Sequence, residues 1–167
     1  HQDDHLLVVD KPHFLPVTPG GRFLQETLLV RLKKKTGLQQ LTPIHRLDRE
    51  TAGVILFSHN PETRGKYQAL FQKRNITKTY HALAPALPAQ TFPLIHRSCM
   101  TEGERFFTMR ESDGVINSET LIEIAEQRGD INLYRLTPVT GKKHQLRVHM
   151  ASLGARSEER RVGKECL

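Results

Sequence analysis

The stretch from His45 to Gly53 places an acid between two arginines, close to a histidine: Asp48 is flanked by Arg46 and Arg49. Nearby cations favour the charged form of a carboxyl group, so we expect Asp48 to be ionised at neutral pH. An ionised carboxylate can act as a nucleophile or as a general base. An apolar run, 54–57, follows at once and predicts a buried strand that holds this polar loop in place.

Two other readings of this stretch remain open from the residues alone. Asp48 can be a salt-bridged acid on a surface loop, since exposed ion pairs are common and contribute little. Asp48 and Glu50 can also form the carboxylate pair of a hydrolase. They lie two residues apart on a loop, so their spacing does not constrain their geometry.

The complete string, H-R-L-D-R-E-T-A-G, resembles the signature H-R-L-D-x-x-T-[SA]-G of RluA-type pseudouridine synthases, which isomerise uridine in RNA. Every fixed position matches. The resemblance implies that Asp48 is the catalytic nucleophile and that Arg46 enters the RNA stack where the target base leaves. We place Arg49 among the RNA-binding residues as well.

A second motif, Lys78-x-Tyr80, resembles the family's K-x-Y. In the family, this tyrosine stacks on the flipped uracil and is placed to help move a proton. The resemblance therefore implies a catalytic Tyr80 and an RNA-binding Lys78. Without the Asp48 motif, Tyr80 would be interpreted as an ordinary aromatic residue of a strand. Its ring face and hydroxyl nevertheless suit a pocket for one base.

The third motif, T-G-K-K-H-Q-L-R-V-H at 140–149, resembles the family's T-G-R-x-H-Q-[IL]-R-x-H. The resemblance pairs Arg147 with Asp48. Lys142 replaces the usual first arginine, which keeps the charge and loses bidentate phosphate geometry. We expect Lys142, Lys143 and His144 to bind RNA. The third motif could also be an ordinary basic helix start that happens to contain His-Gln. The presence of three motifs in the family's order argues against this alternative.

An opening segment, D-x-L-L-V-V-D-K-P, is similar to the first motif of the same family. The family often has a glycine after K-P-x, and here Phe14 occupies that position. Together, the resemblances imply an RNA uridine isomerase. The C1′–N1 bond breaks, the uracil turns and C1′ bonds to C5, whether Asp48 attacks C1′ or the ring. This balanced isomerisation requires no cofactor.

The charge of the chain favours a polyanionic partner. Its net charge is +7 and its isoelectric point is about 9.7, which indicates RNA or, less simply, an anionic membrane surface. No apolar run approaches the roughly 20 residues of a membrane span. Ribosomal and transfer RNA both fit as partners, and we expect a monomer when the protein has its full length.

Cysteine and histidine usage indicates neither disulfides nor metal. Cys99 and Cys166 are expected to be free thiols in a reducing cytoplasm, which predicts a cytoplasmic protein. His144 and His149 are five residues apart, and His1 and His5 lack a nearby ligand pair, so we expect no metal site.

The hydrophobic pattern predicts alternating strands and helices. Lys33, Lys34 and Lys35 lie on the polar side of one predicted helix, and the apolar stripe of another, formed by Tyr67, Leu70 and Phe71, is expected to pack in the core. Residues 94–118 show only weak strand patterns. Strands are predicted at 6–10, 54–57, 76–84, 119–124 and 131–136, and helices at 27–35, 61–73 and after Gly141.

This pattern favours an α+β fold with a mixed, mainly antiparallel sheet and flanking helices. The resemblance implies the same fold with a central RNA-binding cleft. We expect residues 1–154 to form a pseudouridine synthase domain that lacks its C-terminal strands, and 155–167 to be an unrelated or artefactual tail. On this expectation the chain alone is poorly stable and inactive, and a non-catalytic RNA-binding domain is the alternative function.

Overall fold

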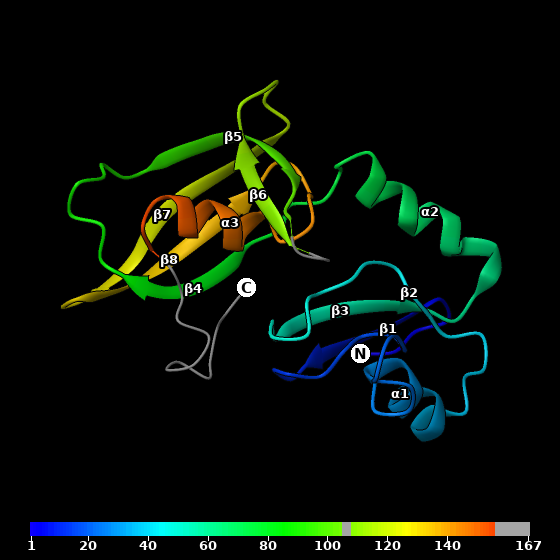
Figure 1. Ribbon diagram of the computed structural model, residues 1–167. Coiled ribbons are helices and arrows are strands. Elements are labelled where there is room, and N and C mark those ends of the chain that lie inside the picture. The colour runs from blue at the N-terminus through cyan, green and yellow to red at the C-terminus, as the bar shows by residue number, and fades with distance from the viewer. Residues whose placement is uncertain (105–107, 156–167) are drawn as a thin grey trace. The chain divides into compact units, whose positions relative to one another are not determined.

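The computed structural model describes residues 1–104 and 108–155. The chain divides into two compact units, the first formed by His1–Ile76 and the second beginning at Thr77. Figure 1 shows the elements of both units. Residues 156–167 of the expected tail, with Cys166, lie outside the described residues.

The first unit contains a three-stranded antiparallel sheet. Strand β3 (Gly53–Ser58) lies between β1 (Leu6–Lys11) and the short β2 (Thr42–Pro43). Its core is an apolar cluster of residues from the sheet, from the first helix and from the loops on either side of that helix: Leu7, Leu15, Val17, Leu28, Leu41, Ile55 and Phe57. This core supports the loop that leads into β3.

The helices of the first unit begin and end at the residues that local chemistry favours. The Thr27 side chain accepts a hydrogen bond from the backbone of Val30 at the start of α1 (Leu28–Thr36), and Gly37 ends α1 with a φ of 75°. Asn60 caps α2 (Pro61–Gln72), whose first residue is proline. Both predicted helices are therefore confirmed to within about one residue.

Two expectations about burial in the first unit are wrong. The stripe of α2 does not pack in the core, because none of the described α2 side chains is buried. Its Leu70 is exposed, and its Phe71 stacks on His45 at 4.8 Å between ring centroids. Strand β3 is buried on one face only: Ile55 and Phe57 are inaccessible, whereas Val54 is 60% exposed.

The second unit contains a five-stranded antiparallel sheet in the order β4-β8-β7-β5-β6. The predicted hairpin is confirmed, and it is interrupted by a bulge between Ile124 and Glu126. Helix α3 places Leu146 and Met150 in the same apolar cluster as Ile122, Tyr134 and Leu136. The elements are β4 (Tyr80–Pro85), β5 (Leu94–Glu102), β6 (Met109–Ser112), β7 (Ser118–Arg128), β8 (Ile131–Pro138) and α3 (Gln145–Ser152).

Two sequence boundaries need correction in this unit. The strand predicted from residue 76 begins at Tyr80, because its ladder with β8 starts at the pair of Tyr80 and Leu136. The weakly patterned region 94–118 contains two strands, β5 and β6, which pair with each other. Their pairing lies at the edge of the sheet.

The fold class is confirmed as α+β. In the described parts of the chain every strand pairing is antiparallel, and the strands form two sheets rather than one. Over the same residues, none of the helices combines the length and the apolar character that crossing a membrane requires.

Candidate active site

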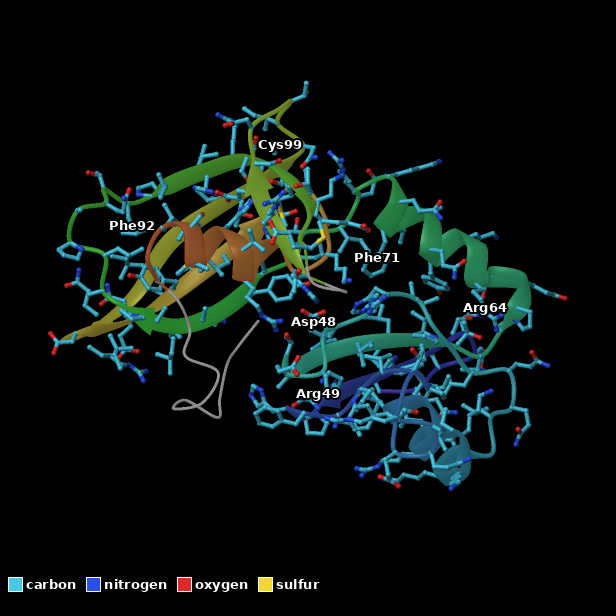
Figure 2. The ribbon with its side chains drawn as sticks, viewed as in Figure 1. Asp48, Arg49, Arg64, Phe71, Phe92 and Cys99 are labelled. Carbon is cyan, nitrogen blue, oxygen red and sulfur yellow. The ribbon has the colours of Figure 1, made fainter. Side chains whose placement is uncertain are left out.

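The candidate nucleophile lies in the loop between β2 and β3. Figure 2 marks Asp48. Asp48 is half-buried in this loop, and Arg46 is exposed. Arg49 donates from Nε to Oε1 of Glu50 at 2.8 Å. The Glu50 carboxylate thus forms an ion pair with the neighbouring Arg49. This pairing argues against Glu50 as the second carboxylate of a hydrolase.

A buried lysine ties this loop to β1. The Lys11 side chain is inaccessible to solvent, and its Nζ donates to three carbonyl oxygens, those of Pro12, Leu15 and Arg49, at 2.9–3.1 Å. Burial lowers the pKa of Lys11 to about 8, against the opposing effect of the Glu50 and Asp48 charges. Lys11 thus fixes the backbone next to Asp48, although burying its positive charge is unfavourable.

Lys11→Met should destabilise the protein by about 1–3 kcal/mol, because carbonyl groups that Lys11 now satisfies lose their donor. The methionine retains most of the apolar stem. Denaturant unfolding measures the change, with Lys66→Met on the exposed side of α2 as the control. A Lys11→Met variant as stable as the control would show that these hydrogen bonds contribute no net stability.

In the second unit, Tyr80 is the first residue of β4 and packs against the apolar cluster of that unit. Lys78 precedes the strand. Its Nζ lies 3.5 Å from the position that a Cβ atom would take at Gly141. The structure therefore brings the second motif beside the loop that opens the third.

The third motif forms this loop and helix α3. Lys142 and Lys143 are exposed, and Arg147 is half-buried on the helix. Gly141 in this loop does not have a positive φ. Instead, His144 has the left-handed conformation, with a φ of 54°, at the position where α3 begins.

The candidate residues fall into two sets. Arg46, Asp48 and Arg49 belong to the first unit. The second unit holds Lys78, Tyr80, Lys142, Lys143, His144 and Arg147. The predicted pairing of Arg147 with Asp48 would join the two sets, and it stays a prediction.

Comparisons with known proteins cover both sets. The sequence profile described as RNA pseudouridylate synthase matches residues 5–152. The chain belongs to the RNA pseudouridylate synthase family. It is 31% identical over 160 residues to human pseudouridylate synthase RPUSD2, a match that covers 92% of this chain and 28% of that protein. The chain thus spans little more than a quarter of this relative.

Other members of the family are similar over more of their length. The dual-specificity RNA pseudouridine synthase RluA of Pasteurella multocida is 30% identical, over 92% of this chain and 71% of that protein. The structure of human RNA pseudouridylate synthase domain containing 4 is 29% identical, with a TM-score of 0.71, over 93% of this chain and 63% of that one.

Phe14, which occupies the position where the family's opening motif often has a glycine, has an unusual backbone conformation. Its φ is 62°, in the left-handed region that glycine adopts without strain. The loop thus keeps the backbone that suits the family's glycine, with a phenylalanine side chain that is 52% exposed. Beside it, the His13 ring and the Glu50 carbonyl are 2.7 Å apart, a second tie to the Asp48 loop.

A polar cluster that the sequence motifs do not indicate lies further along α3. Nε2 of His96 lies 2.7 Å from Oε1 of Glu111, and His149 is inaccessible to solvent. Ligand-type atoms of these three residues lie within 4.8 Å of one another, a set that could hold a metal ion. However, both ring nitrogens of His149 already contact hydroxyl groups, those of Thr120 at 2.9 Å and Ser118 at 3.0 Å. These contacts favour a hydrogen-bonded cluster.

Burial and, to a smaller extent, the nearby His96 lower the pKa of His149 to about 4, against the opposing charge of Glu111. The unfolded chain binds this proton near pH 6.5, whereas the folded protein binds it only near pH 4. The free energy of unfolding should therefore fall as the pH drops from 6.5 towards 4.5. Denaturant unfolding across this range measures the fall.

His149→Asn should flatten this pH dependence, because asparagine takes up no proton. The same change at the exposed His81 is the control and should keep the wild-type slope. Equal slopes in the wild type and in His149→Asn would show that another group is responsible.

Proposed function

We propose that this protein isomerises uridine to pseudouridine in RNA. The observation that carries the proposal is the family match over residues 5–152, which includes all three motifs in both units. A net charge of +7 supports a polyanionic substrate. Ribosomal or transfer RNA is the proposed substrate class, for a monomeric protein of the cytoplasm.

In the proposed reaction, Asp48 is the nucleophile and attacks C1′ or the uracil ring. The C1′–N1 bond breaks, C1′ bonds to C5, and the hydrogen of C5 leaves to solvent while N1 gains a proton. The target base must first leave the stack, which costs a few kcal/mol. Arg46 filling the gap and Tyr80 stacking on the base offset part of this cost.

The loss of the C5 hydrogen supplies a direct test. RNA transcripts labelled with tritium at C5 of uridine should release the label to solvent only when the base is isomerised. Transfer RNA and ribosomal RNA fragments are tested separately, and RNA affinity is measured in parallel. The test uses the full-length protein. Binding without release would favour the non-catalytic RNA-binding domain, and a protein that shows neither binding nor release would overturn the proposal.

RNA affinity should fall steeply with salt, because each neutralised phosphate releases counterions. The proposed contacts are the basic side chains Lys33, Lys34, Lys35, Lys142 and Lys143. Fluorescence anisotropy measures the affinity at salt concentrations between about 50 and 200 mM. Over this range the affinity should fall by at least about a hundredfold. A flat plot would instead indicate a small-molecule substrate.

A further inference from the structure

Gln145, the first residue of α3, uses every hydrogen-bonding position of its side chain. Its Oε1 accepts from the hydroxyl of Thr140 at 2.7 Å and from the backbone N–H of Lys142 at 3.0 Å. Its Nε2 donates to the carbonyl of Glu119 at 3.0 Å and to the hydroxyl of Thr120 at 2.9 Å. A primary amide has two donors and two acceptor positions, so this side chain is fully satisfied.

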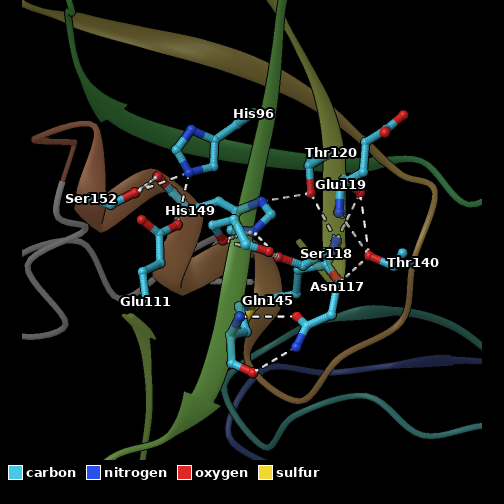
Figure 3. Close-up of polar contacts among 12 residues, drawn as sticks. His96, Glu111, Asn117, Ser118, Glu119, Thr120, Thr140, Gln145, His149 and Ser152 are labelled. Carbon is cyan, nitrogen blue, oxygen red and sulfur yellow. Dashed lines mark hydrogen bonds and ion pairs between the residues drawn. The ribbon is translucent and has the colours of Figure 1, made fainter. Parts of the chain in front are cut away.

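His149 continues the network one helical turn later (Figure 3). Nδ1 lies 2.9 Å from the Thr120 hydroxyl, and Nε2 lies 3.0 Å from Ser118 and 3.2 Å from Ser98. One set of directions satisfies each of these contacts: Thr120 receives from Gln145 and donates to Nδ1, and Nε2–H donates to the serine hydroxyls. The chain of bonds runs from the third-motif loop to β5.

Two stripes hold α3 against the sheet. Gln145 and His149 are four residues apart and therefore share one face of the helix, where both are buried against β7. Leu146 and Met150 repeat the same spacing on the neighbouring face and are buried in the apolar cluster. Together these contacts fix both the position of α3 and its rotation about its own axis.

Arg147 lies between the two polar anchors in sequence, so the rotation of α3 sets the direction in which its side chain leaves the helix. We propose that Gln145, supported by His149, is a positioning residue of the isomerisation that acts through Arg147. This inference rests on the proposed function. Gln145 also accepts a hydrogen bond from the backbone of Lys142, so its side chain joins the loop with the proposed RNA contacts to the helix with Arg147.

Gln145→Glu tests the inference with the smallest change in shape. The carboxylate keeps two acceptor positions and loses both N–H donors to Glu119 and Thr120. We expect the rate of tritium release at saturating RNA to fall at least tenfold, with RNA affinity within about threefold of the wild type. Gln127→Glu makes the same chemical change at an exposed position of β7 and should leave both unchanged.

A double-mutant cycle separates positioning from general damage. If Gln145 acts through Arg147, Gln145→Glu should lower the rate by less than about threefold in an Arg147→Lys background, because the interaction that it supports is already impaired. General damage to the unit would lower the rate by the same factor in both backgrounds. Circular dichroism melting ensures that every variant is assayed well below its melting temperature.

Several results would overturn the inference. An active wild type with an unaffected Gln145→Glu variant overturns the inference alone, as does an additive cycle. An inactive wild type, tested as the full-length protein, overturns the proposed function and the inference with it. Where Gln145→Glu does not fold, the uncharged Gln145→Met takes its place. Failure of both to fold would assign Gln145 to the stability of the unit instead.

Discussion

Asp48→Asn is expected to reduce tritium release by roughly a thousandfold or more, the scale of losses seen when a nucleophile is removed. Asparagine keeps the shape of the side chain and cannot form the covalent intermediate. RNA affinity should stay within about threefold, because the proposed RNA contacts are basic side chains elsewhere. Single-turnover release and fluorescence anisotropy on the same RNA measure the two effects.

Glu50→Gln is the matched control, since Glu50 lies on the same loop and pairs with Arg49. It should lower the rate much less than Asp48→Asn. Equal losses in both variants would show that the Glu50 carboxylate is as important to the reaction as the Asp48 carboxylate. Turnover of Asp48→Asn within tenfold of the wild type would rule out Asp48 as the nucleophile.

Local chemistry explains why most elements of the fold could be predicted. The caps at Thr27 and Asn60 and the left-handed Gly37 act within one helical turn, so their residues are visible in a short window of sequence. The β7–β8 hairpin is equally local, with its turn at Gly129. These signals need no knowledge of the rest of the molecule.

Burial and pairing depend on contacts that a short window does not contain. The spacing of Tyr67, Leu70 and Phe71 predicts a helix, but it does not say whether anything covers the stripe. Strand β5 pairs with β6 and β7, but its residues do not alternate between apolar and polar types in the way that predicts a strand. In both cases tertiary context, rather than propensity, decides the outcome.

The candidate site shows the same division. The motif strings single out Asp48, Tyr80 and Arg147 because their neighbours in sequence are distinctive. The network around His149 instead draws on His96, Glu111 and Thr120, from three different strands. The only sequence signal for it is the i, i+4 spacing of Gln145 and His149, which becomes informative once 145–152 is known to be a helix.

Arg147→Ala is expected to produce the second large loss. If Arg147 is the counter-charge of the Asp48 carboxylate, its removal weakens the nucleophile's orientation and leaves its charge unbalanced. The rate at saturating RNA should fall by about a hundredfold or more, whereas affinity should fall by less than about tenfold. Arg135→Ala, an exposed arginine on β8 of the same unit, is the control and should change both only slightly. A loss of affinity with an unchanged rate at saturating RNA would instead identify Arg147 as a phosphate contact, because a uniform binding contribution stabilises the ground state as much as the transition state.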